Sequence, residues 1–257
     1  MNTLAHKIII STRPLTENDS LKDYLTEKGA TVLDFPMIEI CPVDLNDQII
    51  DTLQNIISYQ WIVFTSKNGV EYFYKLLNSL KIKTEKLDLV KIAVIGKKTS
   101  EEVLKNNFKP FFVSLGNTSE DLLQELSGKI KINEKVLLPL GELAADTLEK
   151  GLTEIGTITR INVYKTLAPK VISEDILEKI RKNNYHLIVF TSPSGFQNFI
   201  ITMNENRIVA DFRIACIGKT TEKEILKNNF KPLLVSSKSD GENFAKELET
   251  FFINHKI

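Results

Sequence analysis

The 257-residue sequence is poor in the residues that build metal sites and disulfide frameworks. It contains two cysteines, Cys41 and Cys216, and three histidines that are far apart along the chain, His6, His186 and His255. Neither set has the spacing of metal ligands or of a disulfide framework, so we expect no metal site and no disulfide. So few cysteines are also typical of a reducing, cytoplasmic setting.

A net charge and a long apolar run are also absent. Lys plus Arg and Asp plus Glu both number 33, so the formal net charge is zero. The sequence therefore offers no global field that would attract nucleic acid or an anionic membrane. The sequence has no stretch of 18 apolar residues, so it predicts no membrane-spanning helix. The apolar run at residues 8–10 is too short for a signal peptide, so we expect a cytoplasmic protein.

The sequence does contain a long internal repeat. Residues 91–114 and 213–236 are identical at 16 of 24 positions. A second pair, residues 61–73 and 187–199, shares seven of 13 positions, and the pairs keep their order along the chain. The chain is therefore one unit of about 125 residues written twice, a period far too long for a solenoid, which predicts two similar domains.

Short apolar runs alternate with amphipathic segments in each repeat, which predicts an α/β fold. Some runs are apolar throughout, as in strands that are covered on both faces. The expected strands are residues 7–12, 31–35, 61–65, 91–95, 110–114, 135–140, 158–163, 187–191, 213–217 and 232–236. Ten strands alternating with helices predict two doubly wound domains, each with a parallel five-stranded sheet. The repeat leaves open whether each half folds alone or the chain crosses between domains near Pro36 and Tyr164.

Polar loops follow several predicted strands, at the edge where open parallel sheets bind ligands. They are residues 11–13, 65–69, 96–99, 191–195 and 218–221. Their hydroxyls, main-chain amides and lysines at helix N-termini favour anions. These loops contain no carboxylate pair, no His with a hydroxyl partner and no Cys–His set. We therefore expect an anionic ligand that is held at many points rather than attacked by a protein nucleophile.

The same side chains also have a purely structural interpretation. Thr99 and Thr221 open Thr-x-x-Glu patterns that are typical of capping boxes, and Ser66 and Ser192 are N-cap candidates too. The lysines of these loops are more often solvated than bound to a ligand. Residues 96–99 lack the earlier glycine of a P-loop, and no G-x-G-x-x-G follows a strand, so neither ATP nor a dinucleotide is expected.

Taken in order, the motifs resemble those of the uroporphyrinogen-III synthase family over about residues 7–250. They are Arg13-Pro14, Phe64-Thr65-Ser66 with Gly69-Val70, Ala93-Val94-Ile95-Gly96 with Thr99, Val163-Tyr164-Lys165-Thr166, Phe190-Thr191-Ser192-Pro193-Ser194-Gly195 and Ile217-Gly218-Lys219-Thr220-Thr221. The resemblance implies a crossover by two extended connectors. One domain would be residues 1–36 plus 168–257, the other residues 37–167, with a cleft between facing loops.

The resemblance also implies a cyclising hydro-lyase of tetrapyrrole, porphyrin and heme biosynthesis. Its substrate would be hydroxymethylbilane, a linear tetrapyrrole with eight carboxylates, which is closed to uroporphyrinogen III with ring D inverted and water lost. No metal or organic cofactor is implied. Tyr164 matches the tyrosine of the family's V-Y-x-T motif, a candidate for assisting departure of the hydroxyl, and a hinge residue is the alternative.

The resemblance further implies which residues bind the substrate. They are Arg13, Ser66, Lys67, Thr99, Ser192, Ser194, Gly218, Lys219 and Thr221. Leu140 departs from the family, which often has an Arg after this strand, so a carboxylate contact is either missing there or supplied by a Lys or Arg elsewhere. We expect a monomer that contacts neither nucleic acid nor membrane, with a transient contact with the preceding deaminase as an open question.

Two other functions fit the residues. One is a non-catalytic, two-lobed binding protein that closes on a small anion by hinge motion. The other is a scaffold of paired flavodoxin-like domains without a ligand. Isomer control over ring closure distinguishes the enzyme from both.

Overall fold

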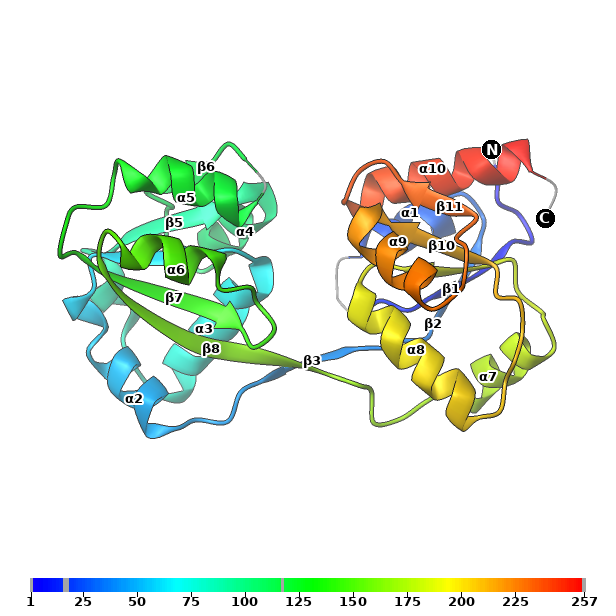
Figure 1. Cartoon of the computed structure of the whole chain (residues 1–257), viewed down its shortest axis with the longest axis horizontal. Coiled ribbons are helices and arrows are strands. Elements are labelled where there is room, and N and C mark those ends of the chain that lie inside the picture. The colour runs from blue at the N-terminus through cyan, green and yellow to red at the C-terminus, as the bar shows by residue number, and fades with distance from the viewer. Residues whose placement is uncertain (1, 16–18, 117, 256–257) are drawn as a thin grey trace. The chain divides into compact units, whose positions relative to one another are not determined.

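The computed structural model describes residues 2–15, 19–116 and 118–255, and the chain folds into two compact units (Figure 1). Unit 1 comprises residues 1–39 and 167–257, and unit 2 comprises residues 40–166. The chain crosses between them within two strands, β3 (Glu39–Pro42) and β8 (Thr157–Leu167). Among the described residues, no helix has both the length and the apolar character needed to span a membrane.

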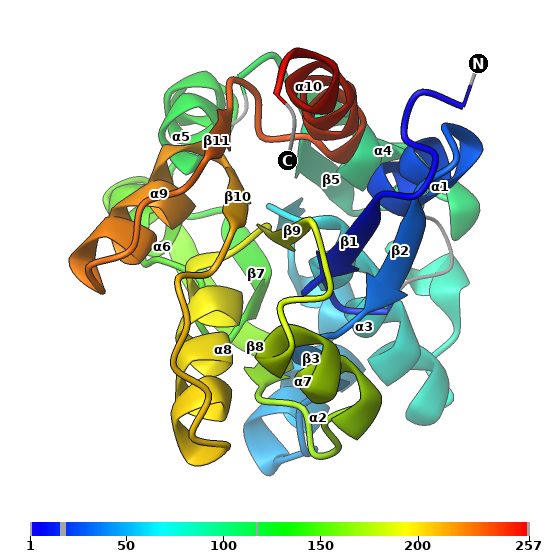
Figure 2. The same ribbon diagram turned by 90° about the vertical axis from the view of Figure 1, so that its right-hand side faces the viewer.

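Unit 1 is built on a parallel five-stranded sheet in the order β11–β10–β9–β1–β2 (Figure 2). Its strands are β1 (Ile8–Ser11), β2 (Thr31–Asp34), β9 (Leu187–Phe190), β10 (Ile214–Ile217) and β11 (Leu234–Ser236). One face is covered by α1 (Ser20–Glu27) and α10 (Gly241–Asn254). The other is covered by α7 (Glu174–Arg181), α8 (Pro193–Glu205) and α9 (Gly218–Lys227).

Alternate residues of the unit 1 strands fill two separate cores. Ile10 and Ile188 face the core beneath α7 and α8, whereas Ile9 and Leu187 face the core beneath α1 and α10. All four side chains are fully buried. Each contributes about 1.5–3 kcal/mol by leaving water, and a one-residue slip would exchange the two cores. Burial therefore fixes the register that brings the carboxyl ends of the strands to one edge.

Unit 2 contains a six-stranded sheet in the order β3–β8–β7–β4–β5–β6, and neighbours from β8 to β6 are parallel. Its further strands are β4 (Trp61–Phe64), β5 (Lys91–Ile95), β6 (Phe112–Ser114) and β7 (Lys135–Gly141). One face carries α2 (Asp47–Gln54), α3 (Lys67–Ser79) and α4 (Gly96–Lys105), and the other carries α5 (Ser119–Ser127) and α6 (Thr147–Thr153). Two short 3₁₀ helices, η1 (Ile56–Ser58) and η2 (Thr84–Leu87), complete the unit.

These two units confirm the predicted doubly wound α/β class, with one correction. All ten predicted strands are present, but the sheet of unit 2 has six strands rather than five because β3 pairs with β8. Strand β3 begins at Glu39 and ends at Pro42, so it lacks the apolar run that marks a covered strand. A proline is tolerated there because β3 lies at the edge of the sheet.

Helices α4 and α9 begin four residues earlier than their Thr-x-x-Glu patterns predict. They follow directly from β5 and β10 at Gly96 and Gly218, whose φ angles are +72° and +71°. Glycine adopts this conformation without strain and lets the chain pass from strand to helix without a loop. Thr99 and Thr221 therefore lie inside the first helical turn, and the predicted capping boxes are wrong at both of these described helix starts.

Candidate active site

The parallel sheet of unit 1 brings three predicted loops to one edge. Arg13 follows β1, Ser192 follows β9 and Gly218 opens α9 after β10, and these three strands are neighbours. The hydroxyl of Thr12 donates to the main-chain oxygen of Val189 at 2.8 Å and so ties the loop after β1 to strand β9. In unit 2 the loops after β7, β4 and β5 lie at the carboxyl edge in the same way, because these three strands are neighbours.

Two predicted serines occupy equivalent N-cap positions. The Oγ of Ser66 accepts from the main-chain nitrogen of Gly69, and the Oγ of Ser192 accepts from that of Gly195, both at 3.0 Å. Their capping interpretation is therefore confirmed. Capping uses an oxygen lone pair and leaves the hydroxyl hydrogen as a donor. The Oγ of Ser194 lies 3.4 Å from that of Ser192, so two hydroxyls cluster at the start of α8.

Two predicted threonines are buried in the first turns of α4 and α9. Thr99 is 4% exposed and Thr221 is 2% exposed. In the part of the chain that the structure describes, neither hydroxyl has a hydrogen-bond partner, and neither oxygen is among the fully buried unpaired atoms, which are Tyr74 Oη, Tyr185 Oη and Arg213 Nε. The hydroxyls of Thr99 and Thr221 therefore still reach solvent, which makes them candidates for groups that a ligand contacts.

The two predicted lysines have different surroundings. Lys219 is 79% exposed and its Nζ lies 3.0 Å from the carboxylate of Glu222 one turn along α9. It therefore has the character of a solvated surface lysine. Lys67 begins α3, and its Nζ lies 3.8 Å from an Oε2 of Glu102, whose side chain is 11% exposed on α4. Lys67, at the start of α3, is thus oriented by a partly buried carboxylate in the second turn of α4.

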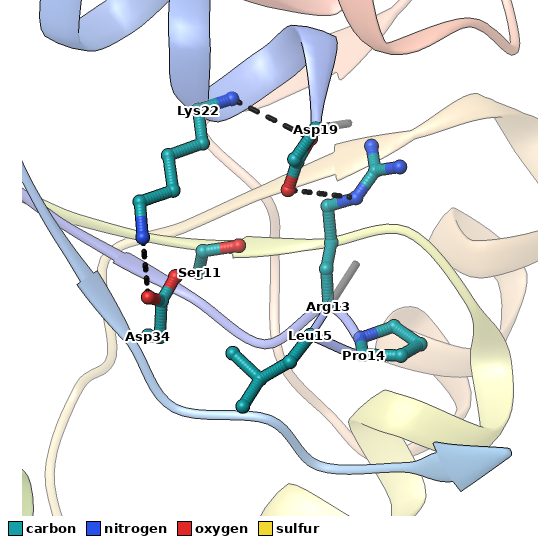
Figure 3. Close-up of a pocket in the computed structure, with 7 residues that line it drawn as sticks. All are labelled: Ser11, Arg13, Pro14, Leu15, Asp19, Lys22 and Asp34. Atoms are coloured by element: carbon teal, nitrogen blue, oxygen red, sulfur yellow. Dashed lines mark hydrogen bonds and ion pairs between the residues drawn. The ribbon is translucent and has the colours of Figure 1, made fainter. Parts of the chain in front are cut away.

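Arg13 is held at the rim of a small pocket of unit 1. Its Nε lies 3.4 Å from Oδ2 of Asp19, and the side chain is 23% exposed (Figure 3). Asp19 also accepts from the main-chain nitrogen of Leu21 at 3.1 Å as the N-cap of α1, so the carboxylate that orients Arg13 is itself fixed. The pocket measures about 330 Å³ and is lined by Ser11, Arg13, Pro14, Leu15, Asp19, Lys22 and Asp34.

Tyr164 lies near the carboxyl end of β8, where the strand pairing is irregular. Leu140 pairs with Asn162 but Gly141 pairs with Tyr164, so one residue of β8 is passed over. Such bulges re-aim side chains. The ring of Tyr164 lies 5.7 Å from that of Tyr72 on α3. Tyr164 is half-buried, and the structure places it beside the β7–α6 loop.

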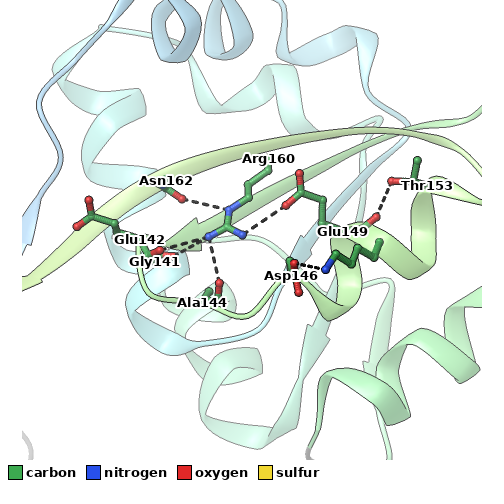
Figure 4. A network of polar contacts seen from close by, with 9 residues as sticks. Gly141, Glu142, Ala144, Asp146, Glu149, Thr153, Arg160 and Asn162 are labelled. Atoms are coloured by element: carbon green, nitrogen blue, oxygen red, sulfur yellow. Dashed lines mark hydrogen bonds and ion pairs between the residues drawn. The ribbon is translucent and has the colours of Figure 1, made fainter. Parts of the chain in front are cut away.

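Arg160 is a residue that sequence reasoning missed. Leu140, at the family's frequent Arg position, is a core side chain 2% exposed. A guanidinium nevertheless lies at this loop, because Arg160 reaches it from β8 (Figure 4). All its contacts are to protein acceptors, so it does not replace a carboxylate contact. Arg160 is the one charged residue in the predicted strand at residues 158–163, which was the available signal.

The histidine and cysteine predictions concern structure rather than catalysis. The Nδ1 of His186 accepts from the main-chain nitrogen of Ile8 at 2.9 Å, which pins the start of β1. Cys41 and Cys216 are free thiols, and burial raises the pKa of Cys216 to about 12. Across the described residues, no group of three or more His, Cys, Asp or Glu side chains could hold a metal ion.

Sequence comparisons find relatives named as uroporphyrinogen-III synthases along most of the chain. The family model described as uroporphyrinogen-III synthase HemD matches residues 19–246. A uroporphyrinogen-III synthase homologue from Methanocaldococcus jannaschii is 32% identical, and the match covers 88% of this chain and 91% of the relative. The porphyrin biosynthesis protein HemD of Ruminiclostridium josui is 27% identical over 93% of this chain, which spans 47% of that relative's length.

Solved structures of the same kind share the fold. The uroporphyrinogen-III synthetase of Helicobacter pylori has a TM-score of 0.65 at 16% identity, covering 95% of this chain and 99% of that one. A mutant uroporphyrinogen III synthase of Thermus thermophilus has a TM-score of 0.63 at 15% identity, covering 97% and 100%. Since the family model also spans well over half of the sequence, the chain belongs to the uroporphyrinogen-III synthase family.

Proposed function

We propose that this protein closes hydroxymethylbilane to uroporphyrinogen III, with inversion of ring D and loss of water. The family match over residues 19–246 carries this proposal. The polar loops support it, because helix N-termini, N-cap serines and the hydroxyls of Thr99 and Thr221 lie at the carboxyl edges of the two sheets. A substrate with eight carboxylates suits several separate anion contacts better than one charged pocket.

The substrate contacts are assigned to named residues in each unit, with Gly218 contributing its main chain. In unit 1 they are Arg13, Ser192, Ser194, Gly218, Lys219 and Thr221, and in unit 2 they are Ser66, Lys67 and Thr99. Thr99 and Thr221 contribute hydroxyls that have no partner in the described part of the chain. Arg13 and Lys67 contribute cations already oriented by Asp19 and Glu102. Binding at many points would fix one conformation of a flexible chain of pyrroles.

The reaction needs orientation more than a protein nucleophile. Loss of the hydroxymethyl hydroxyl as water leaves a reactive azafulvene, with the electron pair supplied by the pyrrole nitrogen. Attack by the substituted carbon of ring D gives a spiro pyrrolenine, which fragments and recloses with ring D inverted. Uncatalysed closure gives the uninverted isomer. The main catalytic task is therefore to hold the substituted carbon of ring D closer to the azafulvene than the unsubstituted α-carbon of the same ring.

Tyr164 is assigned as the group that protonates the departing hydroxyl. Its ring is held from two sides, by Tyr72 and by the main chain at Gly141. A positioned hydrogen-bond donor beside the leaving oxygen assists loss of water as a general acid. The same ring could act as a hinge residue, and Tyr164→Phe separates the two roles because it keeps the ring and removes the proton.

We also propose a cytoplasmic monomer that meets the preceding deaminase transiently. The free thiols of Cys41 and Cys216 are consistent with a reducing compartment. Because hydroxymethylbilane closes by itself to the wrong isomer, a short transfer from the deaminase would protect it. Sedimentation of the protein alone tests the monomer, and sedimentation with that deaminase tests the transient contact.

The experiment supplies freshly made hydroxymethylbilane and separates the product isomers by chromatography. Type III product supports the proposal, whereas type I product alone rejects it. Tight binding of the substrate without isomer control would indicate the non-catalytic binding protein, a reading that the family match does not favour. In the same assay, undiminished turnover by Tyr164→Phe would reject the acid role of the phenol.

A further inference from the structure

One guanidinium holds three main-chain carbonyls of the β7–α6 loop. The Nη2 of Arg160 donates to the carbonyl oxygens of Gly141 at 3.4 Å, Glu142 at 3.4 Å and Ala144 at 3.1 Å (Figure 4). Its Nη1 lies 3.4 Å from Oε2 of Glu149 on α6. The side chain is 20% exposed. The two N–H groups of Nη2 share the three carbonyls, and the planar array of five guanidinium donors leaves Nη1 for Glu149.

The clamped loop is also the part of the main chain that touches Tyr164. The main-chain nitrogen of Glu142 donates to the main-chain oxygen of Tyr164 at 3.0 Å. The α-carbon of Gly141 lies so close to the phenol ring that an added Cβ would come within 2.7 Å of the hydroxyl oxygen. A shift of this loop therefore moves either the backbone or the ring of Tyr164.

A comparison of the two repeats separates the ion pair of Arg160, which both units have, from its contacts with main-chain carbonyls. The matching segments LTEKG at residues 25–29 and LTEIG at residues 152–156 place Lys22 of α1 at the position of Glu149. Ser11 of β1 occupies the position of Leu138 of β7. Because Asp34 pairs with Ser11 and Arg160 pairs with Leu138, Asp34 occupies the position of Arg160. Lys22 and Asp34 form an ion pair, so both units join a helix to the neighbouring strand with the charges exchanged (Figure 3). The ion pair is common to both units, whereas the carbonyl clamp belongs to unit 2.

We infer that Arg160 is a positioning residue for ring closure. It fixes residues 141–144 and, through them, the Tyr164 phenol that acts on the leaving hydroxyl. This role rests on the proposed function. The charge of Arg160 forms the ion pair with Glu149 that joins α6 to β8. Its several donors hold the carbonyls of residues 141–144 in place.

The test compares two single variants that separate the clamp from the ion pair. Arg160→Lys keeps a cation for Glu149, but an ammonium has three N–H donors, so with one on Glu149 it has two left for three carbonyls. Glu149→Gln removes the ion pair and leaves the guanidinium in place. We expect Arg160→Lys to lower kcat by up to about 10²-fold with little change in KM, to raise the share of type I product, and to speed hydrogen exchange at residues 142–144. Glu149→Gln should stay near wild type in all three.

A double variant guards against an unfolded single variant. Glu149→Lys with Arg160→Asp copies the polarity of unit 1, so the bridge is kept and the clamp is lost. It should fold and show the same fall in kcat. Unchanged kcat and exchange in Arg160→Lys or in the double variant would overturn the inference, as would equal damage by Glu149→Gln. Failure of the wild-type protein to make type III product would instead reject the proposed function.

Discussion

The ring of Tyr164 lies against the α-carbon of Gly141, so that a Cβ added to Gly141 would come within 2.4 Å of Cζ. The φ of Gly141 is not in the left-handed region, so alanine is compatible with its backbone. Gly141 is therefore a glycine because the Tyr164 ring leaves no room for a side chain, and not because of its backbone conformation. This contact makes Gly141 a means of displacing the phenol without removing it.

Gly141→Ala should lower turnover while leaving the fold intact. The added methyl group has to move a side chain rather than a buried backbone, and displacement of a catalytic group by about 1 Å can cost up to about 10²-fold in rate. The measurement is kcat with circular dichroism as the check on folding. Gly128→Ala is the matched control, because nothing lies within 4 Å of its added Cβ. Equal turnover in both variants would show that the position of the ring does not matter.

Ser66→Ala and Ser192→Ala should each destabilise their unit. Loss of the cap leaves the main-chain nitrogens of Gly69 and Gly195 without an acceptor, which costs about 1 kcal/mol of helix stability. Urea unfolding of the two variants measures this loss. Glycine at either position should cost a few tenths of a kcal/mol. Alanine variants as stable as wild type would contradict the capping role.

Thr221→Val should lower turnover without lowering stability. Valine has nearly the shape of threonine, and the hydroxyl that it removes has no hydrogen-bond partner in the described part of the chain. The free energy of unfolding should therefore stay the same or rise by up to about 1 kcal/mol. Thr202→Val, near the far end of α8, is the control, and there we expect unchanged turnover. A stable Thr221→Val enzyme with full turnover would remove this hydroxyl from the site.

Stability should fall as the pH drops below about 6.5, in part because of His186. Burial, together with Lys7 and Arg213, lowers the pKa of His186 in the folded protein. Around and below the unfolded pKa the unfolded chain binds more protons, so the contribution is complete above that pKa and is lost as the pH falls through the folded one. Chemical unfolding from pH 7.5 to 5 measures the slope. His186→Asn keeps an acceptor for Ile8 and should flatten it, whereas an unchanged slope would assign the effect to other groups.

The sequence predicts the sheets well because their signal is local. Apolar runs mark every covered strand, and the order of parallel strands then carries the loops with Ser66 and Ser192 to the expected edge. Strand β3 escapes prediction because its pairing with β8 comes from across the sheet and not from its own composition. The start of α4 escapes because a glycine conformation, not a capping pattern, decides it.

The Arg160 clamp could not be predicted from the sequence. It joins a strand residue to carbonyls 16 to 19 positions away, at 3.1–3.4 Å, and main-chain acceptors leave no trace in residue types. The matching pair Lys22 and Asp34 was visible only after the fold had aligned the two units. Contacts that depend on strand register and loop geometry are therefore not predictable from residue types alone.

The partition between product isomers tests the central claim most directly. Increasing amounts of the wild-type protein are added to fresh hydroxymethylbilane, and both isomers are measured as the spontaneous reaction competes. If the protein orients ring D for inverted closure, the type III share rises with enzyme concentration towards complete conversion. If the share of type I stays at the value found without protein, the protein does not direct the closure and the account is wrong.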